Sequence, residues 1–178
     1  MSQRYSPHVQ VRMLSPNKSS RGGAHPTLIV IHATVSHNLR GLGDLKAIGK
    51  FFSEPSAEAS SHVCTDNEGH SARYVLDGDK AWHCAGFNRM SLGIEQILPA
   101  TGAELSEDLY RETARWVARW SKKYGIPIHH GDVSGTRVTK AGVIRHSELG
   151  QYGGGHSDPG PYHFNHMLNL ARFYRSHI

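Results

Sequence analysis

The sequence lacks both a long apolar run and an apolar N-terminal segment. No stretch reaches the roughly 18 consecutive apolar residues of a membrane-spanning helix, which excludes membrane insertion. The first residues, MSQRYSPHVQVRML, contain no apolar core of a signal peptide. We therefore expect a protein that is made in the cytoplasm and has no secretion signal of its own.

The sequence is also poor in cysteine. It has two, Cys64 and Cys84, and no CxxC spacing. This number is too small for the disulfide framework of a small secreted protein. We expect both thiols to be buried and unpaired, in a protein of a reducing compartment.

Runs of basic residues are missing as well, although the chain carries a formal net charge of +5. A positive charge favours an acidic partner, which is either a nucleic acid or an anionic polymer of the cell wall. Because lysine and arginine are spread along the chain, a dedicated nucleic-acid binder is not expected. The HExxH signature of many zinc peptidases is absent too.

Three helices are predicted from apolar periodicity and from end signals. The first covers residues 43–54, ends before Pro55, and has an apolar face made of Leu45, Ile48, Phe51 and Phe52. Ser106 caps the second, which ends at Gly125 and has an apolar face of Leu109, Thr113, Trp116, Val117, Trp120 and Tyr124. The third covers about 162–176 and buries Phe164, Leu168, Ala171 and Tyr174.

Strand signals lie between these helices. Residues 26–32, PTLIVIH, are typical of a strand buried on both faces, and residues 91–98 form another candidate. Residues 60–86 predict a hairpin that turns at 67–69, whereas 15–25 has the composition of an exposed loop. A chain of 178 residues with this order predicts a single α/β domain over 1–178, with a central mixed β-sheet flanked by α-helices.

The abundant residue is histidine, with fourteen copies. His32 ends the apolar strand, and His146 ends the short apolar stretch GVIRH. A histidine at a strand end is often only a hydrogen-bonded structural residue. Two of them in the same setting indicate a zinc site in a groove at the sheet edge, because neutral imidazole is a preferred zinc ligand.

A third ligand is expected from the loop that contains GGGHSDPG. A carboxylate would leave one tetrahedral position open, and Asp158 is a suitable donor because Gly153 to Gly155 let the loop approach closely. His156 is the alternative, since histidine is the commoner zinc ligand. Only one of the two side chains is expected to face the metal, because a single residue separates them in a tight turn.

Six segments, taken in order, carry a family resemblance: IVIHAT, SSHVCTDNEG, AWHCAG, SLGIE, VIRHSE and HSDPGP. They resemble the zinc-dependent N-acetylmuramoyl-L-alanine amidases, the group of the phage lysozyme-type endolysins and the peptidoglycan-recognition proteins. The resemblance extends over about residues 26–164. It implies an α/β amidase domain with one zinc ion per chain.

The resemblance also implies roles for individual residues. His32, His146 and Asp158 match the zinc ligands, and Glu95 matches the catalytic base. His156 stands where the family commonly has lysine or threonine near the scissile carbonyl, and is assigned a catalytic role as hydrogen-bond donor. The chain departs from the family pattern at this position and at three others, which are Arg145, Cys84 and Ser61.

Further groove residues are expected to contact the substrate, namely Thr34, His62, His83 and Asn88. The alternative for His62 and His83 is that they hydrogen-bond the zinc ligands without binding the metal themselves. Five other histidines (His129, His130, His163, His166 and His177) are expected at the surface or in packing, and Glu148 as a solvated loop acid.

The expected function is hydrolysis of the amide between the lactyl group of N-acetylmuramic acid and L-alanine in bacterial peptidoglycan. Without a signal peptide, a phage endolysin made in the host cytoplasm and acting on the cell wall is favoured. The alternatives are a cytoplasmic amidase that recycles muropeptides and a non-catalytic peptidoglycan-binding module. We expect a monomer that binds no nucleic acid.

Overall fold

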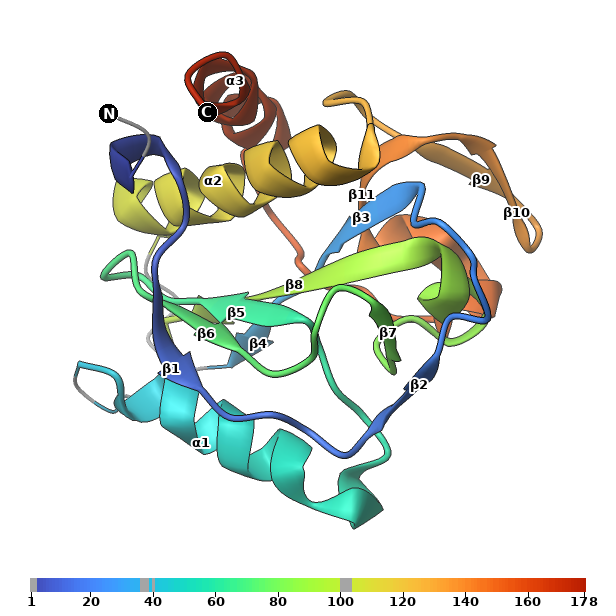
Figure 1. Cartoon of the computed structure of the whole chain (residues 1–178), viewed down its shortest axis with the longest axis horizontal. Coiled ribbons are helices and arrows are strands. Elements are labelled where there is room, and N and C mark those ends of the chain that lie inside the picture. The colour runs from blue at the N-terminus through green and yellow to red at the C-terminus, as the bar shows by residue number, and fades with distance from the viewer. Residues whose placement is uncertain (1–2, 36–38, 40, 100–103) are drawn as a thin grey trace.

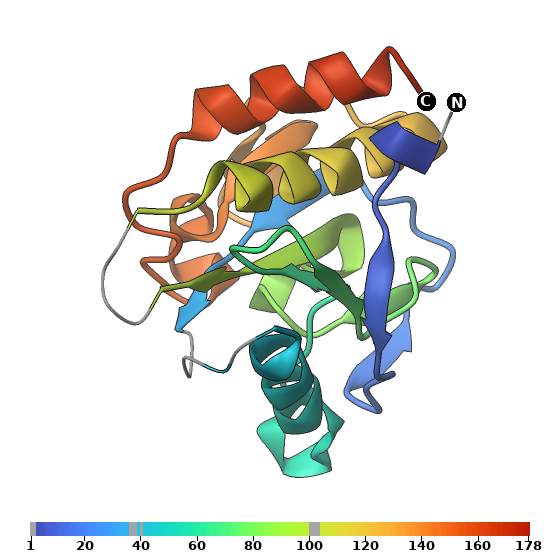
Figure 2. The same cartoon turned by 90° about the vertical axis from the view of Figure 1, so that its left-hand side faces the viewer.

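The computed structural model describes residues 3–35, 39, 41–99 and 104–178. A central sheet lies between α1 (Gly43–Ser53) on one side and α2 (Glu107–Tyr124) with α3 (Phe164–Arg175) on the other (Figures 1 and 2). Short 3-10 segments add η1 (Gln3–Tyr5), η2 (Pro55–Ala57), η3 (Ala85–Met90) and η4 (His146–Gly153). The predicted α/β class and the helix-flanked sheet are confirmed.

The sheet is mixed, as predicted, and its strands follow the order β1-β6-β5-β8-β3-β11, with β4 paired to β8. Their bounds are β1 Val9–Arg12, β3 Leu28–Ile31, β4 Thr34–Val35, β5 Val63–Thr65, β6 Ser71–Arg73, β8 Ser91–Leu98 and β11 Gly142–Arg145. β5, β8, β3 and β11 run parallel, while β6 is antiparallel to β5. The parallel arrangement brings the carboxyl ends of β3 and β11 to one edge of the sheet.

Helix α2 begins and ends where its capping residues predict. The Ser106 hydroxyl accepts a hydrogen bond from the Leu109 amide, and Gly125 adopts the left-handed conformation, with φ of 68°. The helix buries Trp116 and Trp120 against β3, β8 and α3 in the larger core. These two indoles are among the largest fully buried side chains and hold this layer on the sheet.

Helix α1 covers the opposite face, with Leu45, Ile48 and Phe52 buried against β1 and β6. The prediction that Phe51 belongs to the same buried face is wrong, because its side chain is 54% exposed. At about 100° per residue, Phe51 lies roughly 120° around the helix from Leu45, outside the face that packs on the sheet.

The interpretation of residues 15–25 as an exposed loop is only partly correct, because exposed residues alternate with buried ones and 18–20 forms a strand. β2 (Lys18–Ser20) pairs with β7 (Asp79–Ala81), and Ser15, Asn17 and Arg21 are buried. Arg21 donates to the carbonyls of residues 77, 88, 89 and 91, so this polar segment is held by hydrogen bonds to distant backbone. Polar composition did not indicate burial because these partners lie far away in the sequence.

The strand and hairpin predictions are otherwise confirmed, with β8 at 91–98 and β5 paired antiparallel with β6 around a turn. A further hairpin, formed by β9 (Asp132–Ser134) and β10 (Arg137–Lys140), was not predicted.

Both cysteines are buried and unpaired, as expected. Among the described residues, the helices are too short or too polar to cross a membrane.

Candidate active site

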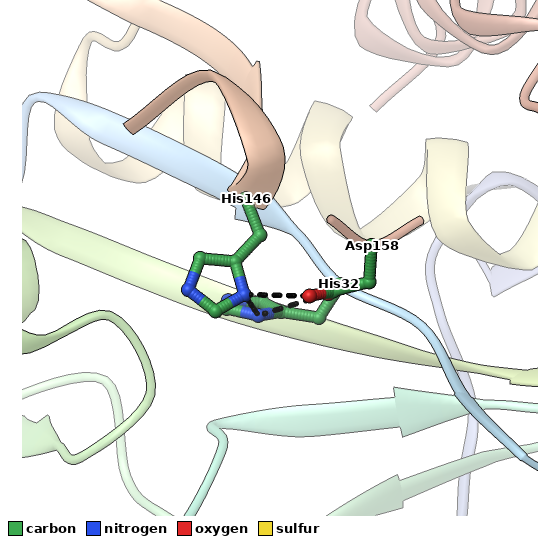
Figure 3. Close-up of side chains that lie close together, drawn as sticks. All are labelled: His32, His146 and Asp158. Atoms are coloured by element: carbon green, nitrogen blue, oxygen red, sulfur yellow. Dashed lines mark hydrogen bonds and ion pairs between the residues drawn. The ribbon is translucent and has the colours of Figure 1, made fainter. Parts of the chain in front are cut away.

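The candidate site lies at the sheet edge where β3 and β11 end. His32 follows β3 directly, and His146 follows β11 and opens η4. Asp158 comes from the loop between η4 and α3, which is held near β11 by a hydrogen bond from the Ser147 amide to the Asp158 carbonyl. In Figure 3 the three side chains point toward one another from these separate segments.

Three ligand-type atoms converge at this point. The Nδ1 atoms of His32 and His146 are 3.0 Å apart, and Asp158 Oδ1 lies 2.9 Å from His146 Nδ1. Asp158 Oδ2 lies 3.6 Å from His32 Nδ1 and accepts a hydrogen bond from the Ala33 amide. The ligand atoms of the trio all lie within 4.8 Å of one another.

This arrangement fits a zinc ion. At zinc–ligand distances of about 2.0–2.1 Å, tetrahedral ligand atoms are separated by about 3.3 Å, close to the spacing found here. His146 Nε2 lies 2.9 Å from the Gly153 carbonyl, to which it must donate, so a neutral His146 presents an unprotonated Nδ1. Two imidazole nitrogens that face one carboxylate at this distance are a donor set for a cation.

The pKa values of the trio follow from burial and from the carboxylate. Burial lowers the pKa of His32 to about 4, against the opposing hydrogen bond to Asp158. The pKa of Asp158 lies well below its ordinary value, because the imidazoles of His146 and His32, which donate to the carboxylate when they are protonated, outweigh its desolvation. Both shifts favour the protonation states that a zinc site requires, namely neutral imidazole and ionised carboxylate.

Glu95 projects from β8 toward the same point. Its Oε1 lies 4.0 Å from His32 Nδ1, and its side chain is 15% exposed. Its Oε2 is buried and has no hydrogen-bond partner among the described residues. Burial, with a contribution from the Asp158 carboxylate, raises the Glu95 pKa to about 8. A largely buried carboxyl with a free oxygen and a raised pKa is suited to proton transfer near neutral pH.

His156 takes a different position from Asp158. Its ring stacks on His146, with centroids 4.4 Å apart and an interplanar angle of 21°. The side chain is 59% exposed, and its Nδ1 lies 4.0 Å from Asp158 Oδ1. Of the two candidates for the third ligand, the structure therefore brings Asp158 into the trio and leaves His156 at the rim.

The trio and Glu95 open into a groove of about 480 Å³. Thr34, His83 and Asn88 line this groove, as expected for residues that contact substrate. Gly153 and Gly154 form part of its wall next to His146 and His156.

His62 does not line the groove. It is fully buried, and its Nδ1 accepts a hydrogen bond from the Gly93 amide beneath the site. Its prediction as a substrate contact is therefore wrong in this structure, because no atom of the ring is accessible. The distinction between the two histidines could not be made from sequence, since each stands next to a short strand, His62 before β5 and His83 after β7.

Glu148 is not the solvated acid that was predicted. It accepts hydrogen bonds from the Arg145 amide and guanidinium and lies 2.8 Å from His130 Nε2. These partners lower its pKa, against the effect of partial burial. Arg145, the departure from the family pattern, thus anchors the first turn of η4, which begins at His146.

Part of the groove was missed from sequence. The groove is also lined by residues that the sequence did not indicate, namely Ile48, Phe51, Phe52, Glu58, Ala59, Ser60 and Trp82. The available signals were Phe51, at the edge of its helix's apolar face, and Trp82, directly before His83. Both are ordinary core residues by type, and only their positions beside the trio give them a different role.

The chain matches the N-acetylmuramoyl-L-alanine amidase family over residues 22–161. No curated protein matches the sequence. The fold is similar to that of the Staphylococcus aureus hydrolase AmiA in complex with its ligand, with a TM-score of 0.72, 16% identity, and coverage of 96% of this chain and 84% of that chain.

Two other solved structures share the fold. A selenomethionine derivative of AmpD has a TM-score of 0.69 and 19% identity, and the match covers 90% of this chain and 93% of that one. The amidase LysC from Clostridium intestinale has a TM-score of 0.60 and 16% identity, with coverage of 94% and 99%. Because the family match extends over more than half of the sequence, the protein belongs to the N-acetylmuramoyl-L-alanine amidase family and is a peptidoglycan amidase.

Proposed function

We propose that the protein is a zinc-dependent hydrolase that cleaves the amide between the lactyl group of N-acetylmuramic acid and L-alanine of the stem peptide. The observation that carries this proposal is the convergence of His32, His146 and Asp158 beside Glu95 in one groove. His32, His146 and Asp158 would hold one zinc ion per chain. A bound zinc ion supplies a Lewis acid that polarises the amide carbonyl and acidifies water.

The protein's own groups would move the protons. Glu95 would take a proton from the attacking water and deliver it to the leaving amine of L-alanine, because its carboxyl is close to the trio and sheltered from solvent. A cation at the trio would favour the ionised form of Glu95 and so make it a competent base. The groove residues Thr34, His83 and Asn88 would position the substrate at this point.

His156 would act as a hydrogen-bond donor at the rim. Its exposed ring is anchored by stacking on His146, within reach of a carbonyl oxygen that enters the groove. A donor of this kind stabilises the negative charge that develops on that oxygen, and its loss typically costs about 10²–10³ in rate.

We further propose that the physiological substrate is the intact cell wall, as for an endolysin. The positive charge of +5 favours contact with anionic wall polymers, and several proteins of similar fold are endolysins. The alternative is an amidase that acts on soluble muropeptides inside the cell. A non-catalytic binding module is disfavoured because all three ligand-type residues and Glu95 are present.

Digestion of purified peptidoglycan tests the reaction. We expect new N-terminal alanine and no new reducing sugar ends, activity lost with a chelator, and activity restored by added zinc. New amino termini from other residues would indicate a peptidase, and full activity in protein shown by elemental analysis to be metal-free would contradict zinc dependence. Comparing rates on intact sacculi and on soluble muropeptides distinguishes the wall enzyme from the recycling enzyme.

A further inference from the structure

We propose that His83 is a positioning residue that, together with Ser91, holds His32 in the tautomer whose Nδ1 is free to bind the metal. This inference rests on the proposed zinc site and assigns a role to two residues that no ligand set includes. The His83 Nδ1 atom lies 2.8 Å from His32 Nε2, on the side of the ring that faces away from the trio.

The direction of the hydrogen bonds follows from one backbone carbonyl. Ser91 Oγ lies 2.9 Å from the Phe87 carbonyl, which can only accept, so the hydroxyl proton is directed there. Ser91 Oγ also lies 3.1 Å from His83 Nε2 and must accept in that contact. The proton of a neutral His83 is therefore on Nε2.

The tautomer of His83 determines the tautomer of His32. With its proton on Nε2, His83 has an unprotonated Nδ1, which accepts from His32 Nε2–H. A neutral His32 then carries its lone pair on Nδ1, the atom that faces His146 and Asp158. The series of hydrogen bonds from His32 through His83 and Ser91 to the Phe87 carbonyl thus leaves His32 Nδ1 unprotonated. The Gly153 carbonyl has the same effect on His146 Nδ1.

The His83 ring is held in place from two sides. Asn88 Oδ1 accepts from the amides of both His83 and Cys84, at 2.9 and 2.7 Å, which fixes the backbone from which the ring projects. A Cβ atom at Gly93 would lie 2.7 Å from His83 Nδ1, so the ring rests directly on the β8 backbone. Ser91 itself is fully buried, which keeps water from competing for its hydroxyl.

Nitrogen-15 NMR of the histidine side chains in the zinc-loaded full chain tests the proposal directly. We expect the shared proton to be bonded to His32 Nε2 and to show coupling across the hydrogen bond to His83 Nδ1. We also expect a proton on His83 Nε2. A shared proton bonded to His83 Nδ1 would overturn the proposal.

Zinc affinity, measured by competition with a chelator, gives the second test. Ser91→Ala removes the acceptor that orients His83 but leaves His83 in place, and should weaken zinc binding by up to about 10-fold, the lower end of the usual effect of losing a direct partner of a metal ligand. Cys84→Ala is the matched control. Its Sγ lies 3.2 Å from Ser91 Oγ and 3.8 Å from His83 Nε2, in the same buried space, so its replacement changes the packing there but leaves the Ser91 hydroxyl in place to accept from His83 Nε2.

Equal losses in Ser91→Ala and Cys84→Ala would show that packing and not proton direction supports the site, and would overturn the proposal. Unchanged affinity in Ser91→Ala would overturn it as well. The failure of the proposed function looks different: the parent chain would then bind no zinc, while the nitrogen spectra of the same chain would still place the protons of His32 and His83.

Discussion

At the scale of single residues, the two carboxyl groups of the site, those of Glu95 and Asp158, have different surroundings. Glu95 lies beside the trio on β8, and one of its carboxyl oxygens has no hydrogen-bond partner in the described part of the chain, whereas Asp158 faces both histidines and accepts from the Ala33 amide. Two carboxyl groups in one groove therefore have opposite pKa shifts, raised for Glu95 and lowered for Asp158. This contrast supports the proposed roles, proton transfer for Glu95 and cation binding for Asp158.

Replacement of the proposed base tests the first assignment. Glu95→Gln should fold and keep its zinc, because the amide is isosteric and Glu95 does not belong to the trio. Turnover should fall by at least about 10². The rate of release of N-terminal alanine from peptidoglycan, with zinc content measured on the same sample, provides the check, and a parental rate would place the base elsewhere.

A pair of variants tests the second assignment. Asp158→Ala should lose zinc or bind it much more weakly, and its melting temperature should fall, because metal binding stabilises the loop that supplies the ligand. His156→Ala should keep one zinc per chain and lose mainly turnover, since its ring lies at the rim. Metal analysis and thermal unfolding of both variants decide the matter. Zinc lost with His156 and kept without Asp158 would reverse the two roles.

At the scale of the elements, β8 supports the site by its backbone as well as by Glu95. Gly93 accommodates the His83 ring at a distance that no side chain would permit, and its amide donates to His62. One residue of the strand thus contacts two buried imidazoles. The strand is therefore expected to be sensitive to small additions of volume at this position.

Gly93→Ala tests this sensitivity. The new methyl group would displace the His83 ring, so unfolding in urea should require about 1–3 kcal/mol less free energy, the usual cost of overpacking. Zinc affinity should fall in the same variant. Gly78→Ala is the control, because a Cβ there meets nothing within 4 Å, and both properties should stay at parental values. Parental stability of Gly93→Ala would show that the ring can move aside freely.

At the scale of the whole molecule, buried titratable groups couple the fold to pH. Burial lowers the pKa of His62 to about 3, and the nearby Arg21 guanidinium acts in the same direction. The folded state therefore resists protonation of this ring, whereas the unfolded chain takes up a proton near pH 6.5. Its contribution to stability is complete above about pH 6.5 and is lost progressively as the pH falls toward 3.

Unfolding in urea at two pH values measures this coupling. Between pH 7.5 and pH 5 the His62 contribution should fall by about 2 kcal/mol. His62→Asn, which keeps an acceptor near the Gly93 amide and does not titrate, should be less stable at pH 7.5 and lose less on acidification. A chelator in all samples removes the effect of zinc release. The same pH dependence in parent and variant would exclude His62 as the cause.

The sequence by itself determined the features that depend on near neighbours. The caps at Ser106 and Gly125, the apolar periodicity of α2 and the turn at 67–69 are local, and each predicted its element. The order of the motifs predicted the site residues that lie together in one groove, which are His32, Glu95, His146 and Asp158. That their spacing suits zinc could be seen only in the folded chain.

Only the tertiary structure decided the environment of each side chain. Arg21 is buried because four carbonyls between residues 77 and 91 accept hydrogen bonds from its guanidinium, and Phe51 lines the groove and does not join the core beneath α1. His62 and His83 both stand next to short strands, but one hydrogen-bonds the β8 backbone and the other contacts His32. Burial and hydrogen-bond direction depend on groups that are distant in sequence and adjacent in space, and these determine which of the fourteen histidines can do chemistry.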